Sequence, residues 1–430
     1  MKKVLAILLA CMLVIPAFAL TASAEDAAPK GSVYWLNFKP ESDEALQAIA
    51  AKYTEETGVP VKVVTAASGT YSQTLTAEMD KSSAPTLFVV GNQAGVETWG
   101  DYCYDLTGTP VAEELNTDAY NLYDADGKLC SIGYSVEAFG IIANKELLEK
   151  AGHSLDEITN FETLKAVADD IHARAEELGF DAFTSSGMDD SSSWRFSGHL
   201  ANLDLFYESR DAGGWTETPA EITGAYLENF KNLWDLYTTD TATDKSALAT
   251  GGFDARDEFG TGKAAFYQNG SWEYAALTGS GENEYGMDPA NLAMIPFYGG
   301  VEGEEEAGLN CGTENCWAVN AKASEDDIQA TLDFMYWLVT DGSEDAVATF
   351  GLMPYTNAVA PDNTFLAQAD QYTVDGKYVM TWAFNFTPNV DDWRAGVVSA
   401  MNQYDAGGDW AMVEAAFVQG WAQQYSAINE

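Results

Sequence analysis

The sequence predicts an α/β protein built from two lobes. The chain has 430 residues, which is more than one ordinary hydrophobic core accommodates. Its first ninety residues alternate strand-like and helix-like segments in a β-α-β-α-β order, which is typical of a mainly parallel sheet with helices on both faces. No repeat or low-complexity linker divides the sequence. We therefore expect the chain to cross between the lobes more than once.

Short strands and amphipathic helices make up this first region. β-Branched and aromatic residues predict strands over residues 32–38, 59–65 and 85–90. Apolar residues at helical spacing predict helices over residues 42–57 and 71–81, with Ser42 and Gly58 capping the first. Open sheets of this kind bind ligands at the carboxyl ends of their strands, so the candidate binding loops are residues 37–41, 68–71 and 91–93.

The stretch from Gly133 to Gly152 contains a carboxylate in an unusual place. An apolar, strand-like run over residues 134–143 changes to helical spacing at Asn144, a good N-cap, and Gly152 follows as a C-cap. Glu137 lies in the middle of the apolar run. Because burial of an unpaired charge is costly, Glu137 is expected in a cleft with a partner or a ligand. The alternative is a glutamate on the solvent side of a half-buried strand.

The rest of the chain continues the α/β pattern. A polar, Ser-rich loop is expected over residues 185–193 and an acidic, Gly-rich surface loop over residues 299–308. A helix end, a strand and a tight turn are expected within residues 259–272, and mostly helix after residue 351. Further strands are predicted over residues 292–296 and 309–319, and helices over residues 160–177, 222–237 and 325–339.

The N-terminal residues 1–24 have the features of a secretion signal. Two lysines precede an apolar run, and Ala22-Ser23-Ala24 supplies a cleavage site. A competing interpretation makes Cys11 the lipidated residue of a lipobox. The formal net charge of −46 disfavours nucleic acid and anionic lipid as partners. Anionic solutes are disfavoured too unless a local basic pocket exists, and the sequence shows no Lys/Arg cluster.

The cysteines and histidines predict no metal or cofactor. Without Cys11, four cysteines remain, and three disulfide pairings are open in an exported chain. The pairing with the shortest loops is Cys103–Cys130 with Cys311–Cys316, while zinc is less favoured because no second pair has finger spacing. A calcium loop around residues 123–129 is rejected, because its first and last ligand positions would be Leu122 and Gly133, which supply no carboxylate. Gly262-Lys263 lacks the phosphate-loop pattern. The three histidines share no metal-like spacing: His153, His172 and His199.

Aromatic residues carry a stronger signal than any catalytic motif. The sequence has no nucleophile elbow, and Asp189-Asp190 are adjacent residues in a Ser-rich loop, which point apart. Several aromatic side chains instead occur in polar turns, where a core residue is out of place. A flat aromatic face with an N–H or O–H suits the C–H face of a pyranose ring. These residues are Trp35, Tyr71, Trp194, Trp272, Tyr355 and Trp393.

Five segments together resemble the family 1 extracellular solute-binding proteins of ABC importers, the maltose-binding-protein type. They are VYWLNF with the following helix and TGVPVKVV, APTLFVVGNQ, DGKLCSIGYSVEAFGIIANKELLEKAG, FGTGKAAFYQNGSW and GLMPYTNAV. The resemblance covers nearly all of the chain after residue 24. It implies a periplasmic-binding-protein-like fold, two α/β lobes joined by hinge strands with a sugar between them. The implied lobes are residues 25–138 with 297–348, and residues 139–296 with 349–430.

The resemblance also implies site residues. The sugar-contacting acid of the hinge crossing falls on Glu137. Loops after the first and third strands give Asn37, Glu41 and Asn92, and the aromatic positions fall on Trp194 (with Arg195), Trp272 and Trp393. Thr313 belongs to a matching polar loop, whose bracketing cysteines depart from the family. Tyr71 and Tyr355 are candidates on physical grounds alone.

The expected function is that of an exported carbohydrate receptor without catalysis. Its partners would be a sugar and the membrane permease of an ABC importer, and the protein would act as a monomer. Two alternatives stay open: the same fold with another cargo such as a polyamine, and a secreted glycoside hydrolase.

Overall fold

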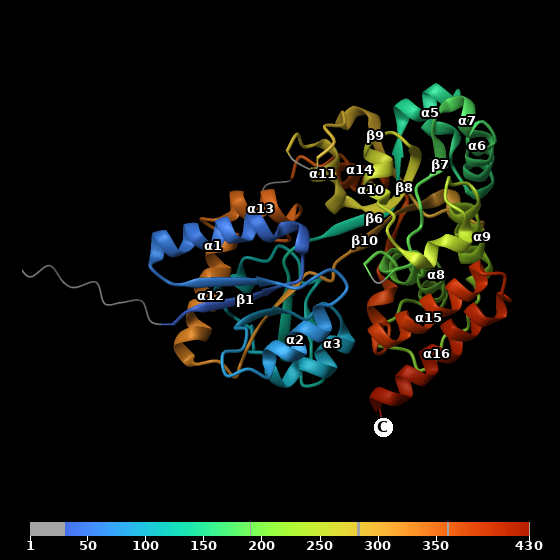
Figure 1. Ribbon diagram of the computed structural model, residues 1–430. Helices are drawn as coiled ribbons and strands as arrows, with labels where there is room; N and C mark the ends of the chain where they lie inside the picture. Colours follow the sequence, from blue (N-terminus) through green and yellow to red (C-terminus); the bar gives the residue numbers. More distant parts are fainter. Residues whose placement is uncertain (1–30, 190, 282–283, 359–360, 430) are drawn as a thin grey trace, which may run out of the picture.

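The computed structural model describes residues 31–189, 191–281, 284–358 and 361–429. The predicted signal, residues 1–24, and Cys11 lie outside these residues. Figure 1 shows two lobes side by side, each a sheet covered by helices on both faces, which confirms the predicted two-lobed α/β class. Within the described residues, no helix is both long and apolar enough to cross a membrane.

The first lobe is built on a six-stranded sheet. Its order is β2-β1-β3-β11-β5-β4, in which β1 pairs in parallel with β2 and β3, while β11 runs antiparallel to β3 and β5. The strands are β1 (Val33–Asn37), β2 (Val61–Thr65), β3 (Leu87–Val89), β4 (Leu122–Tyr123), β5 (Leu129–Gly133) and β11 (Cys316–Val319). The helices are α1 (Asp43–Thr57), α2 (Tyr71–Met79), α3 (Gln93–Trp99), α4 (Pro110–Glu113), α12 (Glu325–Val339) and α13 (Ser343–Phe350).

The second lobe has its own sheet, in the order β12-β10-β6-β8-β7, with β9 also on β6. The central strand β6 runs antiparallel to all three of its neighbours, and the outer pairs are parallel. Both sheets are therefore mixed, and not mainly parallel as expected, because strands that cross from the other lobe enter each sheet antiparallel. The strands are β6 (Glu137–Asn144), β7 (Asp181–Phe183), β8 (Ala264–Gly270), β9 (Leu292–Ile295), β10 (Ala307–Gly312) and β12 (Tyr378–Thr381).

Helices pack on both faces of this second sheet (Figure 1), and separate apolar clusters lie on the two faces. Its helices are α5 (Lys145–Ala151), α6 (Phe161–Ala173), α7 (Ala175–Leu178), α8 (Asn202–Asp211), α9 (Leu227–Thr239), α10 (Ala255–Gly260), α11 (Tyr274–Thr278), α14 (Thr364–Val374), α15 (Val390–Asp405) and α16 (Ala411–Asn429). A π-helical turn at Arg195–Leu200 precedes α8.

The helix caps predicted in the stretch from Gly133 to Gly152 are confirmed. The Asn144 side chain accepts a hydrogen bond from the Leu147 N–H at the start of α5, and Gly152 ends the helix with a φ of 88°, in the left-handed region that glycine adopts without strain. Gly58 ends α1 in the same way, with a φ of 76°. Ser42, in contrast, caps α1 without a side-chain hydrogen bond.

The chain crosses between the lobes three times, and the two later crossings differ from our expectation. We expected residues 297–348 in the first lobe, but β10 pairs with β6 and β12 of the second sheet. The apolar run over residues 309–319 hides two strands, because only Thr313-Glu314-Asn315 interrupts it. Residues 349–430 were expected in the second lobe, but Tyr355 packs in the core of the first. Phe365, at the start of α14, packs in the second lobe again.

Hydrogen bonds tie the crossing segments together into the hinge. The Tyr134 N–H donates to the Asn315 carbonyl at 2.8 Å, and the Val136 N–H donates to the Leu352 carbonyl at 2.7 Å. The Ser135 hydroxyl donates to the Phe350 carbonyl at 2.6 Å. Because each crossing is held by another, the lobes are joined by a narrow, ordered set of backbone segments rather than by a loose linker.

The four described cysteines are all free thiols. Cys103 and Cys130 are buried in the first lobe and close enough to interact, and burial, with Cys130 adding to it, raises the pKa of the Cys103 thiol to about 12. Cys311 lies on β10 and Cys316 on β11, in different sheets, and the Cys316 thiol donates to the Tyr120 carbonyl at 3.7 Å.

A buried carboxyl on α8 makes the stability of the second lobe depend on pH. Burial, with a smaller contribution from Glu208, raises the pKa of Asp204 to about 8. The native state therefore holds a proton that the unfolded chain releases near pH 4, so stability is lost as the pH rises from about 4 to about 8. We expect Asp204→Asn to raise the melting temperature by a few degrees at pH 8 and to change it little at pH 4. An equal effect at both values would contradict the assignment.

Candidate ligand-binding site

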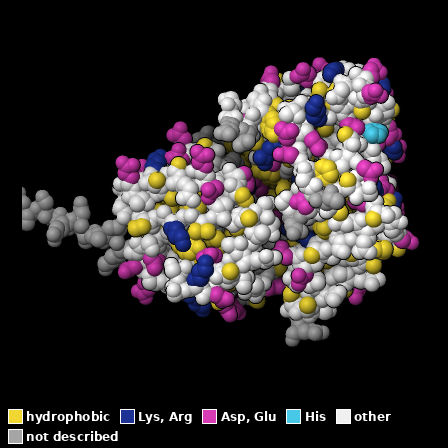
Figure 2. All heavy atoms as spheres, viewed as in Figure 1, with side chains coloured by type: hydrophobic (Ala, Val, Ile, Leu, Met, Phe, Trp, Pro, Cys, Tyr) yellow, Lys and Arg dark blue, Asp and Glu magenta, His cyan; other side chains and the backbone are white. Residues whose placement is uncertain are grey.

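A cavity of about 1010 Å³ lies between the two lobes. The first lobe contributes the loops that follow β1, β2 and β3, the carboxyl ends at which binding was expected. The second lobe contributes residues from β6, from the π-helical turn, from the start of α10, from the end of β8 and from the start of α15. Figure 2 shows the surface hollowed between the lobes, with acidic side chains scattered over both.

Aromatic rings form the second lobe's wall of the cavity. The Trp194 and Trp272 ring centroids lie 6.0 Å apart, and His199 lies 5.3 Å from Trp272. The Trp194 Nε1–H donates to the Ser191 carbonyl at 2.8 Å, which fixes that indole. Trp272 covers Gly270, where a Cβ would collide with the indole at 2.2 Å. Trp382 continues the wall at the end of β12.

The opposite wall, on the first lobe, also carries rings. Phe38 packs edge-on against Tyr71 at 5.3 Å. The Tyr71 hydroxyl accepts from the Val89 N–H at 2.7 Å and donates to the Leu36 carbonyl at 3.4 Å, which joins the start of α2 to the sheet. Burial raises the pKa of Tyr71 well above its usual value, so the phenol is neutral. The cavity is thus bordered by aromatic rings on two opposite sides.

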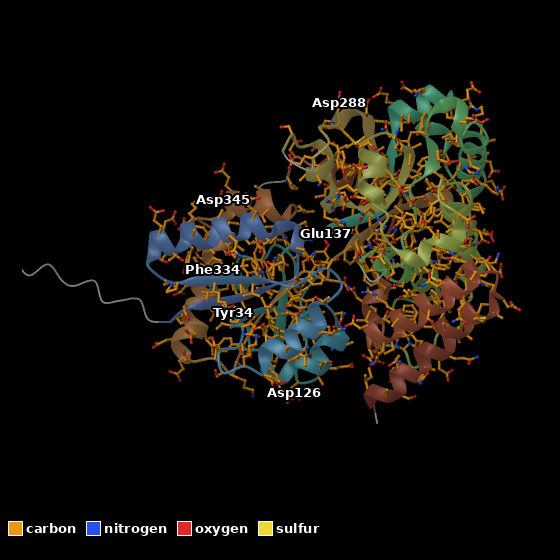
Figure 3. All side chains as sticks on the ribbon, in the orientation of Figure 1. Tyr34, Asp126, Glu137, Asp288, Phe334 and Asp345 are labelled. Atoms are coloured by element: carbon orange, nitrogen blue, oxygen red, sulfur yellow. The ribbon has the colours of Figure 1, made fainter. Side chains whose placement is uncertain are left out.

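Glu137 lies at the junction of the lobes (Figure 3), as the first residue of β6. Its partner is Lys39, from the loop after β1, whose Nζ lies 2.5 Å from the Glu137 Oε1. The Asn315 Nδ2 donates to the other carboxylate oxygen at 2.8 Å, and Glu41 lies 3.2 Å from the Lys39 Nζ. Burial alone would lower the pKa of Lys39, but Glu137 and Glu41 outweigh it and raise that pKa, so the ammonium group stays charged.

A second carboxylate in the cavity is also paired. Arg256, on α10, binds Glu273 through two bonds, Nε to Oε2 at 2.6 Å and Nη2 to Oε1 at 2.9 Å. The hydrogen bonds to Glu273 raise the pKa of the Arg256 guanidinium by more than burial lowers it. Glu273 directly follows Trp272 in one short 3-10 turn, so this bidentate pair lies beside the aromatic wall.

The structure brings seven of the eleven predicted site residues to the cavity. They come from both lobes and from separate parts of the chain: Glu41, Tyr71, Asn92, Glu137, Trp194, Arg195 and Trp272. Asn92 has a second role, because its Oδ1 accepts from the Gly95 N–H at 2.7 Å and caps α3. Their contacts with a ligand stay predictions.

Four predicted residues lie elsewhere. Asn37 is fully buried and shapes the loop of Lys39, donating to the Lys39 carbonyl at 2.7 Å. Thr313 holds the hinge by donating to the Ser135 carbonyl at 2.5 Å. Tyr355 packs against Trp317 in the core of the first lobe, with the rings 6.4 Å apart. Trp393 packs against Phe417 and donates to its carbonyl at 3.1 Å.

Several cavity residues were missed. Trp382 follows a strand that the sequence did not predict, because the region after residue 351 was expected to be mostly helix. His199 was grouped with scattered histidines, although its place five residues after Trp194 was a usable signal. Arg394 directly follows the predicted Trp393 on α15. The helix was expected, but Arg394 and not Trp393 faces the cavity. Lys39 and Glu314 adjoin predicted residues in the same loops.

The cavity lining combines aromatic faces with polar and charged side chains. Within the described residues, no group of three or more His, Cys, Asp or Glu side chains has the arrangement of a metal site. Asp189 accepts from the Ser191 N–H at 2.9 Å, and Asp190 lies outside the described residues. Aromatic faces with polar groups between them can enclose a ligand that has flat apolar faces and a hydroxyl rim.

The model of the bacterial extracellular solute-binding proteins matches residues 48–373 of the chain. The protein belongs to this family. No curated protein matches the sequence. As its family's description states, the solute-binding protein acts on the extracellular side of the cell.

Solved structures share the fold of this solute-binding protein. RafE in complex with raffinose is 15% identical, with a TM-score of 0.69 over 93% of this chain and 100% of that one. A Bacillus licheniformis sugar transporter in complex with stachyose is 17% identical, with a TM-score of 0.67 over 91% and 100%. A family 1 extracellular solute-binding protein from Bifidobacterium longum subsp. infantis is 18% identical, with a TM-score of 0.61 over 92% and 100%.

Proposed function

We propose that this solute-binding protein is a carbohydrate receptor that delivers a sugar or oligosaccharide to an ABC importer. The observation that carries the proposal is the ring-lined cavity between the lobes, with Trp194, Trp272 and Trp382 on one side and Phe38 and Tyr71 on the other. A saccharide offers an apolar face to such rings and hydroxyls to the polar groups between them. The sugars in the complexes of its structural neighbours, raffinose and stachyose, support the same class of ligand.

Ligand binding would close the lobes about the hinge. A solute held between the two walls contacts both, so it favours the closed form by the difference in its affinity for the two forms. A membrane permease would then dock on the closed form, and the receptor would leave the solute chemically unchanged. The protein would act as an exported monomer, with residues 1–24 as its secretion signal.

Thermal shift tests the class of ligand. The probes are neutral and charged oligosaccharides, raffinose and stachyose among them, and the polyamine spermidine. A ligand at about 100 times its dissociation constant adds roughly 2.7 kcal/mol of stability. We expect at least one saccharide to raise the melting temperature and to be recovered intact after incubation. A shift with spermidine and with no saccharide would refute the proposal in favour of a polyamine receptor. Release of shorter sugars would refute it in favour of a hydrolase.

Trp272→Ala tests the aromatic wall. Loss of a stacking indole should weaken the binding of any saccharide that the panel identifies by about 2 kcal/mol, roughly a thirtyfold rise in the dissociation constant. Isothermal titration calorimetry measures the change. Tyr336→Ala, which removes an exposed aromatic ring on α12 outside the cavity, is the matched control and should bind as the wild type does. Equal affinities for the wild type and the Trp272 variant would remove this residue from the site.

A further inference from the structure

The arginines of this acidic chain gather at the cavity. The sequence has five arginines among its 21 basic residues, against 67 acidic ones. Three of the five line the cavity: Arg195, Arg256 and Arg394. The sequence showed no such cluster, because the three residues lie about 60 and 140 positions apart and only the fold brings them together. Seven carboxylates line the same cavity, so the pairing of each cation decides which of them is free for a ligand.

The cavity cations differ in how well they are compensated. Arg256 is held by both oxygens of Glu273, and Lys39 is held by Glu137 and Glu41. Arg195 is 6% exposed, yet no carboxylate of the described residues lies within 4.0 Å of its guanidinium. Its Nη1 donates to the Tyr267 hydroxyl at 3.5 Å, and its Nε is buried without a hydrogen-bond partner. Asp189 interacts with it electrostatically, but only from beyond ion-pair distance.

Arg394 lies beside Arg195 and is also weakly compensated. Its guanidinium covers Gly198, where a Cβ would lie 2.7 Å from Nη2, so it packs on the π-helical turn that begins with Arg195. Its closest carboxylate oxygen is the Glu314 Oε1, at 4.0 Å, and its Nε has no partner. Burial, followed by Arg394, Arg195 and Lys39, holds the pKa of His199 far below its usual range. Three cations therefore act on one neutral imidazole.

A buried guanidinium with no carboxylate in contact is costly, and a ligand carboxylate removes that cost with bidentate geometry. We propose that the ligand is an acidic saccharide whose hexuronate carboxylate binds to Arg195, with Arg394 beside it. This inference rests on the proposed carbohydrate function and narrows its ligand class. The neighbouring carboxylates do not fill the role, since Glu137, Glu41 and Glu273 are already occupied by Lys39 and Arg256.

Matched ligands isolate the charge. The probes are oligosaccharides of two to four galacturonate, glucuronate or mannuronate residues, their methyl esters, and neutral oligosaccharides of the same length, each measured by titration calorimetry. We expect at least one free acid to bind at least tenfold more tightly than its ester, since the ester keeps the ring and loses the charge. Binding of neutral sugars with no preference for any acid over its ester overturns this inference and leaves the carbohydrate receptor standing. Binding of no saccharide of any kind overturns both.

Arg195→Gln shows which cation carries the preference. The variant should weaken binding of the free acid at least tenfold and binding of the methyl ester less than threefold. The preference for the acid over its ester is then lost. Arg210→Gln, which removes an arginine paired with Asp211 away from the cavity, is the control and should preserve it. Equal weakening of acid and ester by the Arg195 variant would mean that this side chain reads hydroxyls, which overturns the assignment.

The unliganded protein gives an independent readout. If Arg195 is kept for a ligand, Arg195→Met should leave the melting temperature unchanged or raise it by about 2 °C, because it removes a buried charge that no carboxylate contacts. Arg256→Met should lower it by several degrees, because it leaves Glu273 buried without a cation. A fall of more than 5 °C in the Arg195 variant would make Arg195 a structural residue and overturn the inference.

Discussion

Replacing Glu304 by Ala is expected to destabilise the second lobe by about 3–5 kcal/mol. The side chain is 2% exposed, and its carboxylate accepts four backbone N–H groups. One oxygen accepts from Phe161 at 2.7 Å, and the other from Gly299, Gly300 and Val301 at 2.8, 2.8 and 3.1 Å. The variant leaves these donors buried without a partner, and each unsatisfied group costs about 1–3 kcal/mol.

Urea unfolding measures this loss, and two further variants define its origin. Glu304→Gln keeps an amide oxygen for part of the network but places an NH₂ among N–H donors, so it should fall between the wild type and Ala. Glu305→Ala changes the adjacent, exposed glutamate and should cost less than about 0.5 kcal/mol. Similar midpoints for the variants at positions 304 and 305 would show that the network adds nothing to stability.

Glu304 also shows where sequence reasoning stops. The segment GEEEAG predicted an acidic surface loop, and Glu305 and Glu306 are indeed exposed. Three consecutive identical side chains have no periodicity, so nothing in the sequence indicates which one turns inward. The choice is made by the backbone around Gly300 and Gly303, whose φ values are 88° and 82°, and by the start of α6, about 140 residues away in sequence.

Other parts of the molecule were predictable because their causes are local. Strand–helix alternation predicts the α/β class. The carboxyl ends of β1, β2 and β3 meet at one edge of the sheet, which brings Glu41, Tyr71 and Asn92 to the cavity. The positions of residues that depend on long-range packing were not predicted. Trp393 and Arg394 differ by one position on α15, and only the contact with α16 decides that the indole faces the core.

The sequence predicted that Glu137 needs a partner but did not identify it, because the partner is brought close only by long-range packing. An apolar strand with one carboxylate required a partner or a ligand, and the structure supplies Lys39, which lies 98 residues away in the sequence. The two residues join the loop after β1 in the first lobe to the first residue of β6 in the second. The pair therefore lies at the first hinge crossing and also lines the cavity.

Lys39→Met is expected to cost about 3–5 kcal/mol of stability, because it leaves Glu137 buried with one amide donor and no cation. The double variant Lys39→Met/Glu137→Gln removes both charges and should recover most of the loss, since replacing a whole buried pair is often close to neutral. Lys52→Met is the control. Its pair with Asp345 is about half exposed, and its loss should cost less than about 1 kcal/mol. A deficit for Lys39→Met no larger than that of the control would contradict a structural role for the buried pair.

The double variant also separates the two roles that remain for Glu137. If the carboxylate only balances Lys39 at the hinge, the restored protein should bind its saccharide with wild-type affinity. If it also accepts a hydroxyl of the ligand, stability returns while the dissociation constant stays raised by about tenfold, because a hydrogen bond to a charged group contributes about 1.5–3 kcal/mol. Unfolding and titration calorimetry on one protein thus distinguish a hinge pair from a ligand contact, which neither burial nor distance can do while Lys39 occupies the carboxylate.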